Sequence, residues 1–169
     1  PVPSTPVPST ECTPPFVLGP RGCYYNTSDA KNFNDAKGHC ESYDSILVEP
    51  KNQQENEFVS NLLNEGEHSW LGMSDYVTEG DWKYNDGSSM TYTNWNVGEP
   101  KGDDYIMVYA DPHPKGKWND IPNRDDIRKN VVCFKPNDTD GTSELSTPPT
   151  PVLPPTECTS PFIPGPRGC

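Results

Sequence analysis

Oxygen-bearing side chains alternate with tryptophans over the stretch from residue 70 to residue 120. It begins with Trp-Leu-Gly-Met at 70–73, passes Asn-Trp-Asn at 94–96 and Glu-Pro-Lys at 99–101, and ends with Trp-Asn-Asp at 118–120. Calcium takes about six to eight oxygen ligands from Asp, Glu and Asn side chains and from backbone carbonyls. The stretch therefore predicts calcium coordination, with a bound polyol completing the shell.

Breaks in the pattern show which elements can hold these side chains. Gly, Pro and an Asn-Asp-Gly turn exclude one long helix or a regular sheet, so we expect a loop-rich region pinned by aromatic anchors. A helix is expected before it, capped by Ser28 or Asp29, with Phe33, Ala36 and Cys40 forming an apolar stripe.

A second helix is expected over residues 51–63, with Gly66 ending it. Strands are expected at 46–48, 105–109 and 131–134, with a hairpin-like turn within 82–92. Two helices around a small mixed antiparallel sheet define an α+β fold.

Composition limits the compartment and the partners. The formal net charge is −12, which disfavours binding to a phosphate backbone, so we expect no nucleic-acid partner. No apolar run is long enough to insert into a membrane. The chain begins Pro-Val-Pro without the pattern of a signal peptide, so we interpret it as a piece of a longer or processed protein.

The six cysteines can all be placed in pairs, which indicates an oxidising, extracellular compartment. Cys12 and Cys23 are close enough in sequence to close a small hairpin, and Cys158 and Cys169 repeat that pair. Cys40 and Cys133 remain, and a bond between them would tie the first helix to the last strand. Zinc thiolates are the alternative, although no Cys-x-x-Cys or Cys/His spacing supports them.

Low-complexity tracts and one repeat suggest the organisation of the chain. Residues 1–10 form a Pro/Ser/Thr linker, and residues 137–156 form a Pro/Thr-rich one. Between them, residues 11–136 form the globular domain. The segment 11–23 recurs at 157–169, which we interpret as the truncated start of a second copy. We therefore expect tandem domains in the same chain.

The three motifs, in this order and with matching cysteines, resemble the C-type lectin domain over residues 11–135. Residues 70–73 are similar to its Trp-Ile-Gly-Leu core strand, 99–101 to its Glu-Pro-Asn or Gln-Pro-Asp tripeptide, and 118–120 to its Trp-Asn-Asp. The resemblance implies a long ligand-binding loop, calcium-dependent sugar binding and a Cys40–Cys133 disulfide. It also implies a secreted glycan-binding module without enzymatic activity, and no catalytic pair or motif opposes this.

The ligand set follows from this resemblance. It implies that Glu99, Asp103, Asn119 and Asp120 bind calcium, and that Glu99, Lys101, Asn119 and Asp120 contact the sugar. A Glu-first tripeptide is associated with mannose-, glucose- or fucose-type glycans, and a cis peptide before its proline is common. In the alternative, Trp118 is a core residue and the two residues after it only form a turn.

An auxiliary calcium site is also implied, with Asp75 and Glu79 as ligands and Asp104 as a third. A solvated acidic loop is the alternative. Sequons predict N-glycans on Asn26 and Asn137.

Lys101 departs from the family pattern. An ammonium group has donors and no acceptor, so Lys101 cannot ligate calcium and repels it at short range. The second hypothesis is therefore a calcium-independent domain of the same fold, in which Lys101 replaces the metal and the ligand is a protein or a mineral, ice or matrix surface.

Overall fold

The computed structural model describes residues 11–111, 114–122 and 124–137. The predicted linkers at 1–10 and 137–156, the second copy at 157–169 and the Cys158–Cys169 pair lie outside these residues, apart from Asn137. Within them the chain forms two helices and eight strands. The α+β class is confirmed.

In chain order, the helices and strands are β1 (Val17–Leu18), β2 (Gly22–Lys31), α1 (Phe33–Glu41), β3 (Ile46–Leu47), α2 (Gln53–Leu62), β4 (Ser69–Ser74), β5 (Lys83–Tyr84), β6 (Tyr105–Val108), β7 (Trp118–Ile121) and β8 (Lys129–Pro136).

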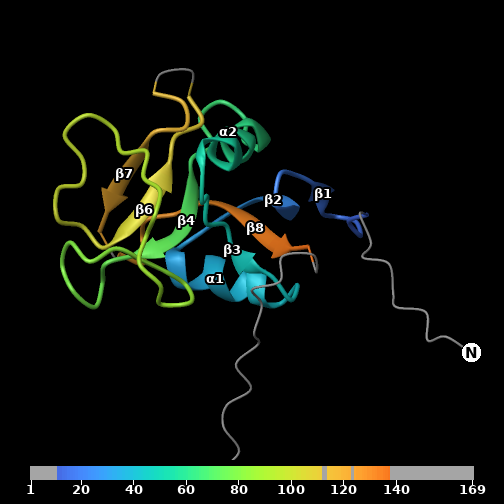
Figure 1. Cartoon of the computed structure of the whole chain (residues 1–169), viewed down its shortest axis with the longest axis horizontal. Coiled ribbons are helices and arrows are strands. Elements are labelled where there is room, and N and C mark those ends of the chain that lie inside the picture. Colours follow the sequence, from blue (N-terminus) through green and yellow to red (C-terminus); the bar gives the residue numbers. More distant parts are fainter. Residues whose placement is uncertain (1–10, 112–113, 123, 138–169) are drawn as a thin grey trace, which may run out of the picture.

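The strands join in the order β1-β2-β8-β4-β6-β7, while β3 pairs with β8 and β5 with β4. All pairs are antiparallel except the short contact between β4 and β8. In Figure 1, α1 and α2 lie on opposite sides of the strands, and the long loop between β5 and β6 lies at the end away from β1.

The first helix begins later than predicted. The proposed caps Ser28 and Asp29 were wrong, because residues 28–31 continue β2 along β8. Asn32 caps α1 instead, since its Oδ1 accepts a hydrogen bond from Asp35 N at 2.8 Å. The apolar stripe is confirmed, because Phe33, Ala36 and Cys40 are buried.

The second helix is shorter than the predicted 51–63 range. Asn52 caps this helix, since its Oδ1 accepts a hydrogen bond from Glu55 N at 3.0 Å. The backbone is already extended at Leu63, so Gly66 does not end the helix. The expected strands at 46–48, 105–109 and 131–134 are confirmed within a few residues. The turn within 82–92 is also confirmed, with Tyr84 N donating to Ser88 O at 3.0 Å.

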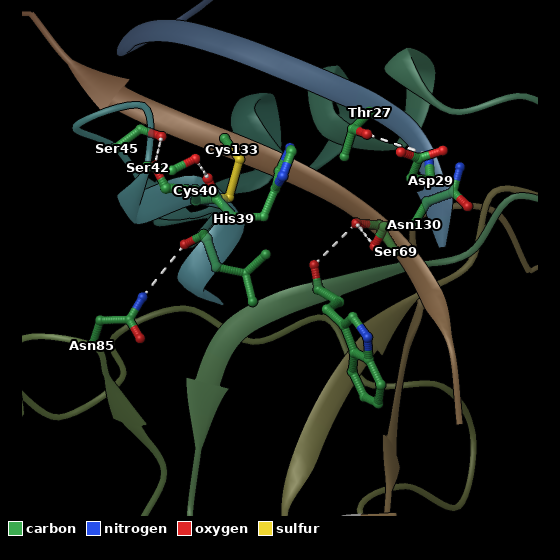
Figure 2. The surroundings of a disulfide bond; sticks show 12 residues. Thr27, Asp29, His39, Cys40, Ser42, Ser45, Ser69, Asn85, Asn130 and Cys133 are labelled. Carbon is green, nitrogen blue, oxygen red and sulfur yellow. Dashed lines mark hydrogen bonds between the residues drawn. A yellow bond between two sulfur atoms is a disulfide. The ribbon is translucent and has the colours of Figure 1, made fainter. Parts of the chain in front are cut away.

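Two disulfides fix the frame of the domain. Cys12 pairs with Cys23, and Cys40 on α1 pairs with Cys133 on β8 with 5.2 Å between their Cα atoms (Figure 2). Both predicted pairings are confirmed, which excludes zinc thiolates at these residues. The second bond closes a loop of 93 residues, so it strongly reduces the entropy of the unfolded chain.

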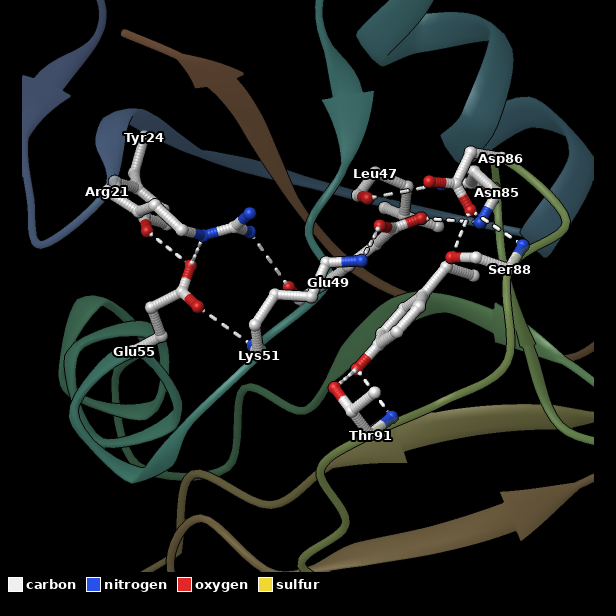
Figure 3. Close-up of polar contacts among 11 residues, drawn as sticks. Arg21, Tyr24, Leu47, Glu49, Lys51, Glu55, Asn85, Asp86, Ser88 and Thr91 are labelled. Carbon is white, nitrogen blue, oxygen red and sulfur yellow. Dashed lines mark hydrogen bonds and ion pairs between the residues drawn. The ribbon is translucent and has the colours of Figure 1, made fainter. Parts of the chain in front are cut away.

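A buried polar network joins the start of β2 to α2 (Figure 3). The fully buried carboxylate of Glu55 accepts hydrogen bonds from Arg21 Nε at 2.7 Å, Tyr24 OH at 2.8 Å and Lys51 N at 2.8 Å. Two of these donors come from around the start of β2 and the third from just before α2. The network therefore holds α2 against the sheet by satisfying a charge that would otherwise be costly to bury.

Candidate functional site

Strand β7 carries the Trp-Asn-Asp motif and pairs with β6. Alternation along the strand buries Trp118 and Asp120 and leaves Asn119 partly exposed. Trp118 is completely buried, and its Nε1 donates to Asn56 Oδ1 on α2 at 2.6 Å. The alternative was right that Trp118 is a core residue, but the two residues after it lie on a strand and do not form a turn.

Asp120 organises the loop that follows the tripeptide. Its Oδ2 accepts hydrogen bonds from the backbone N–H groups of Lys101 at 2.6 Å, Gly102 at 2.8 Å and Asp103 at 2.8 Å. Three successive N–H groups turned to one oxygen form an anion-binding nest. Its other oxygen, Oδ1, is buried and has no hydrogen-bond partner among the described residues.

Asn119 adds a second spare oxygen. Its Oδ1 is also buried and lacks a hydrogen-bond partner within the described part of the chain. A buried acceptor without a donor costs free energy unless a cation, a water or a ligand meets it. The strand therefore presents two unsatisfied oxygens from adjacent residues.

Glu99 reaches the same place from the long loop. The Glu99–Pro100 peptide is cis, as expected for this family, and the Glu99 side chain is only 3 % exposed. Interaction with the Asp120 carboxyl group, together with burial, raises the pKa of Glu99 against the opposing effect of Lys101. Burial also acts to raise the pKa of Asp120, but Glu99 and the three backbone N–H groups hold it below its usual range. The two carboxyl groups therefore shift each other's pKa in opposite directions.

Lys101 occupies one oxygen of Glu99. Its Nζ lies 2.5 Å from Glu99 Oε1, although the lysine side chain is 67 % exposed. The ammonium group therefore supplies a positive charge to Glu99 from the solvent side. The structure shows no hydrogen bond from it to Asp120 or Asn119, whose spare oxygens remain unmet within the described residues.

Asp103 lies beside this set without joining it closely. Its backbone N–H holds Asp120, and burial followed by the charges of Asp120 and Asp104 raises the pKa of its carboxyl group. The sharp turn before it is made by Gly102, whose φ of +102° suits glycine.

The auxiliary residues come from the adjacent loop. Asp75 Oδ2 accepts a hydrogen bond from Gly80 N at 2.8 Å, Asp75 N donates to Asp104 O at 3.3 Å, and Asp75 Oδ1 is buried without a partner among the described residues. Burial, then the charges of Asp104 and Asp120, raises the pKa of Asp75. A Cβ atom at Gly102 would lie 3.5 Å from Glu79 Oε1, so that carboxylate leans toward the same loop.

In the described part of the chain, no group of three or more His, Cys, Asp or Glu side chains is arranged to hold a metal ion. Two acidic side chains, Glu99 and Asp120, meet closely, and the third oxygen of the set comes from the amide of Asn119. These hard oxygens, two of them unsatisfied, fit calcium in type. Lys101 is the member that does not fit, so an ion would have to displace its ammonium group from Glu99.

Sequence reasoning missed the residue that fixes β7. Asn56 is buried, accepts from Trp118 Nε1 and donates from Nδ2 to Gly116 O at 2.9 Å. It lies 62 residues before Trp118, and an Asn within a helix gives no signal of such a contact.

The predicted glycosylation sites have different surroundings. Asn26 Nδ2 donates to Leu62 O at 2.9 Å, so a glycan on this nitrogen would leave it a single hydrogen for that contact. Asn137 is half-buried at the end of the described residues. Both N-glycans stay predictions. No helix in the described residues is long and apolar enough to cross a membrane.

Comparison with known proteins agrees with this geometry. The model of the Lectin C-type domain family matches residues 29–135, so the chain belongs to the C-type lectin domain family. Among curated proteins, it is similar to a perlucin-like protein of Mytilus galloprovincialis, with 36% identity over 104 residues. That match covers 54% of this chain and 66% of the perlucin-like protein, slightly less than two thirds of its length.

Solved structures show the same fold. The carbohydrate-recognition domain of the mouse scavenger receptor C-type lectin matches with a TM-score of 0.68 and 29% identity, covering 76% of this chain and 100% of that one. The carbohydrate-recognition domain of cow CD23, crystallised in the presence of GlcNAc2Man3 oligosaccharide, matches with a TM-score of 0.67 and 27% identity, covering 76% of this chain and 98% of that one. The predicted C-type lectin-like fold is confirmed.

Proposed function

We propose that this domain is an extracellular glycan-binding module that uses one calcium ion at Glu99, Asn119 and Asp120. The observation that carries this proposal is the pair of buried, unsatisfied oxygens of Asn119 and Asp120 beside the carboxylate of Glu99. Two neighbouring carboxyl groups that act on each other's pKa gain more from a divalent cation than from each other.

Each residue has a distinct part in this proposal. Asn119 and Asp120 would hold the ion with their spare oxygens, while the second oxygen of Asp120 keeps the loop of residues 101–103 in place. Bound calcium would supply open coordination positions for two sugar hydroxyls. Glu99 and Asn119 would also hydrogen-bond those hydroxyls, and Asp103 would add a carboxylate at the edge. A Glu-first tripeptide favours mannose-, glucose- or fucose-type glycans.

The comparisons favour binding over catalysis, because the family and the solved neighbours are described as lectins and carbohydrate-recognition domains. Family membership and the cow CD23 crystal with an oligosaccharide add support for glycans as partners.

The wider setting of the domain is also a proposal. Two disulfides within the described residues fit a secreted protein. Tandem copies on Pro/Thr-rich linkers would raise the avidity of a weak single site through effective concentration. The auxiliary residues Asp75, Glu79 and Asp104 would hold a second calcium ion that stiffens the ligand loop.

One observation favours a second candidate. The ion pair between Lys101 Nζ and Glu99 Oε1 already neutralises one ligand. A domain that kept this pair would be calcium-independent and would recognise protein, mineral, ice or matrix surfaces.

Calorimetric titration of calcium into the full 169-residue chain separates the two functions. We expect binding, and the loss of one calcium ion in Asn119→Ala, a variant that removes an oxygen with no hydrogen bond in the described structure and leaves the auxiliary residues intact. Asp120→Asn keeps an acceptor for the loop and should weaken binding at least tenfold. Asp126→Asn, which changes an exposed carboxylate paired with Arg124, is the matched control. A parent chain that binds no calcium at millimolar concentration refutes the calcium-dependent function.

A further inference from the structure

The ammonium group of Lys101 is exposed to solvent and forms an ion pair with Glu99 inside the site. The lysine side chain is 67 % exposed, whereas the side chain of Glu99 is 3 % exposed. The backbone N–H of Lys101 is held by Asp120 at 2.6 Å, so the main chain is fixed and only the side chain can swing. Its charge is therefore kept at the rim of the site in every rotamer.

Calcium and this ammonium compete for the same oxygen. Lysine has no acceptor, so it cannot share the ion as a ligand, and two cations repel at close range. The lysine end of this pair is solvated, which weakens the pair, so an incoming divalent ion can displace the ammonium group from the buried Glu99 carboxylate. The freed Nζ then lies within one side-chain length of the sugar hydroxyls held at Glu99 and Asn119.

The charge balance of the loaded site does not repel an anion. Glu99, Asp103 and Asp120 carry three formal negative charges, which one calcium ion and Lys101 together cancel. The acidic character of the whole chain, with a formal net charge of −12, acts from greater distance and is screened by salt. At this rim the freed ammonium would be available to an anion, with the Asp103 carboxylate, on which Lys101 already acts, as a competitor.

We propose that the preferred ligand is an acidic glycan, whose hydroxyls bind at the calcium site and whose sulfate or carboxylate group pairs with Lys101. This inference rests on the proposed calcium-dependent function and names its ligand class. Three rotatable donors on a flexible stem suit a sulfate or carboxylate whose position varies among glycans.

Binding of matched monosaccharides tests the ligand class. The full chain in calcium is titrated with methyl mannoside and methyl fucoside, with their sulfated forms, and with a uronic acid. We expect each anionic sugar to bind about three- to tenfold more tightly than its neutral parent, with the sulfated and carboxylated arms deciding which anion is preferred. Added salt should reduce the preference.

Variants at residue 101 separate charge from shape. Lys101→Gln should abolish the preference and leave neutral-sugar binding intact, Lys101→Arg should retain it, and Lys37→Gln on α1 should change nothing. Equal affinity for neutral and anionic sugars in the parent chain overturns the acidic-glycan inference while leaving the proposed function in place. Absence of all sugar binding in calcium, in the parent and in Lys101→Gln, overturns both.

A readout without any sugar tests the release of the lysine. Reductive methylation followed by mass spectrometry measures how accessible each amine is in chelator and in calcium. We expect calcium to raise the labelling rate of Lys101 at least twofold, with Lys37, an exposed lysine on α1, as the reference. Calcium binding by calorimetry with no change in Lys101 labelling overturns the exchange of the two cations.

Discussion

Asn56→Ala is the change that most directly tests how the fold positions the site. Asn56 is buried on α2 and makes two hydrogen bonds to the segment that begins β7, one from Trp118 Nε1 at 2.6 Å and one to Gly116 O at 2.9 Å. Trp118 immediately precedes the two proposed ligands on the same strand. Removing the amide therefore loosens the segment that carries them.

The expected cost follows from which groups lose their partners. The Nε1–H of the completely buried Trp118 would be left without an acceptor, which costs about 1–3 kcal/mol. Gly116 O would keep its second hydrogen bond, from Asn94 Nδ2 at 2.7 Å, so its loss is small. The small void left by the amide adds about 1 kcal/mol. We expect a loss of about 2–4 kcal/mol, a large part of the roughly 5–15 kcal/mol typical of a domain.

Urea denaturation followed by tryptophan fluorescence measures this loss, and two further variants isolate its cause. Asn94→Ala removes the other hydrogen bond to Gly116 O but leaves Trp118 paired, so it should cost about 1 kcal/mol or less. Trp118→Phe combined with Asn56→Ala should cost clearly less than the sum of the single changes. An Asn56→Ala variant no less stable than Asn94→Ala, or additive with Trp118→Phe, would refute this reasoning.

Three other predictions concern the frame of the domain. Glu55→Gln should lose about 3 kcal/mol in urea denaturation because it removes the charge of a fully buried carboxylate that pairs with the partly exposed Arg21, whereas exposed Glu57→Gln should change stability by less than about 0.5 kcal/mol. Burial raises the pKa of Glu49, so the folded state holds its proton more tightly than the unfolded state. The stability that Glu49 contributes is therefore full below its unfolded pKa and is lost as pH rises through its folded pKa. In parallel pH-dependent melts, the stability of the parent minus that of Glu49→Gln should fall over this pH window. Replacing Cys40 and Cys133 together with serine should cost about 3–5 kcal/mol by the same denaturation assay, and an unchanged midpoint would contradict the loop-entropy argument.

The sequence predicted the elements whose signals are local. The stripe of Phe33, Ala36 and Cys40 follows the helical period and is buried, and the second helix lies within two residues of its predicted bounds at each end. Its start, and that of the first helix, depend on which Asn faces the first turn. The residue types alone did not distinguish Asn32 from the capping candidates just before it.

Strands β2 and β7 were not predicted, because their local sequences do not favour strands. Strand β2 runs through Asn-Thr-Ser-Asp, residues that favour turns, and is held by its pairing with β8 more than 100 residues later in the chain. Strand β7 is short and polar, so Trp-Asn-Asp carries no strand pattern, yet pairing with β6 and the bond to Asn56 make it extended. Tertiary contacts overrode weak local preferences in both places.

The sequence predicts only part of the candidate site. The motifs identify its residues, but the roles of the two Asp120 oxygens depend on distances that no motif contains. One oxygen is consumed by three backbone N–H groups and the other is spare. We therefore predict that the loop keeps its shape without calcium.

Hydrogen exchange can test that independence directly. The amide protons of Lys101, Gly102 and Asp103 should be protected in chelator as well as in calcium, because Asp120 Oδ2 accepts from all three in the described structure without a metal. Asp120→Ala should raise their exchange rates at least tenfold, the factor expected when about 1.4 kcal/mol of hydrogen bonding is lost, while the amide of Asn96, bonded to Trp118 O, serves as the reference. Amides that exchange like those of an unfolded peptide in chelator, and slow only when calcium is added, would show that the ion builds the loop. Preorganisation by Asp120 would then be wrong.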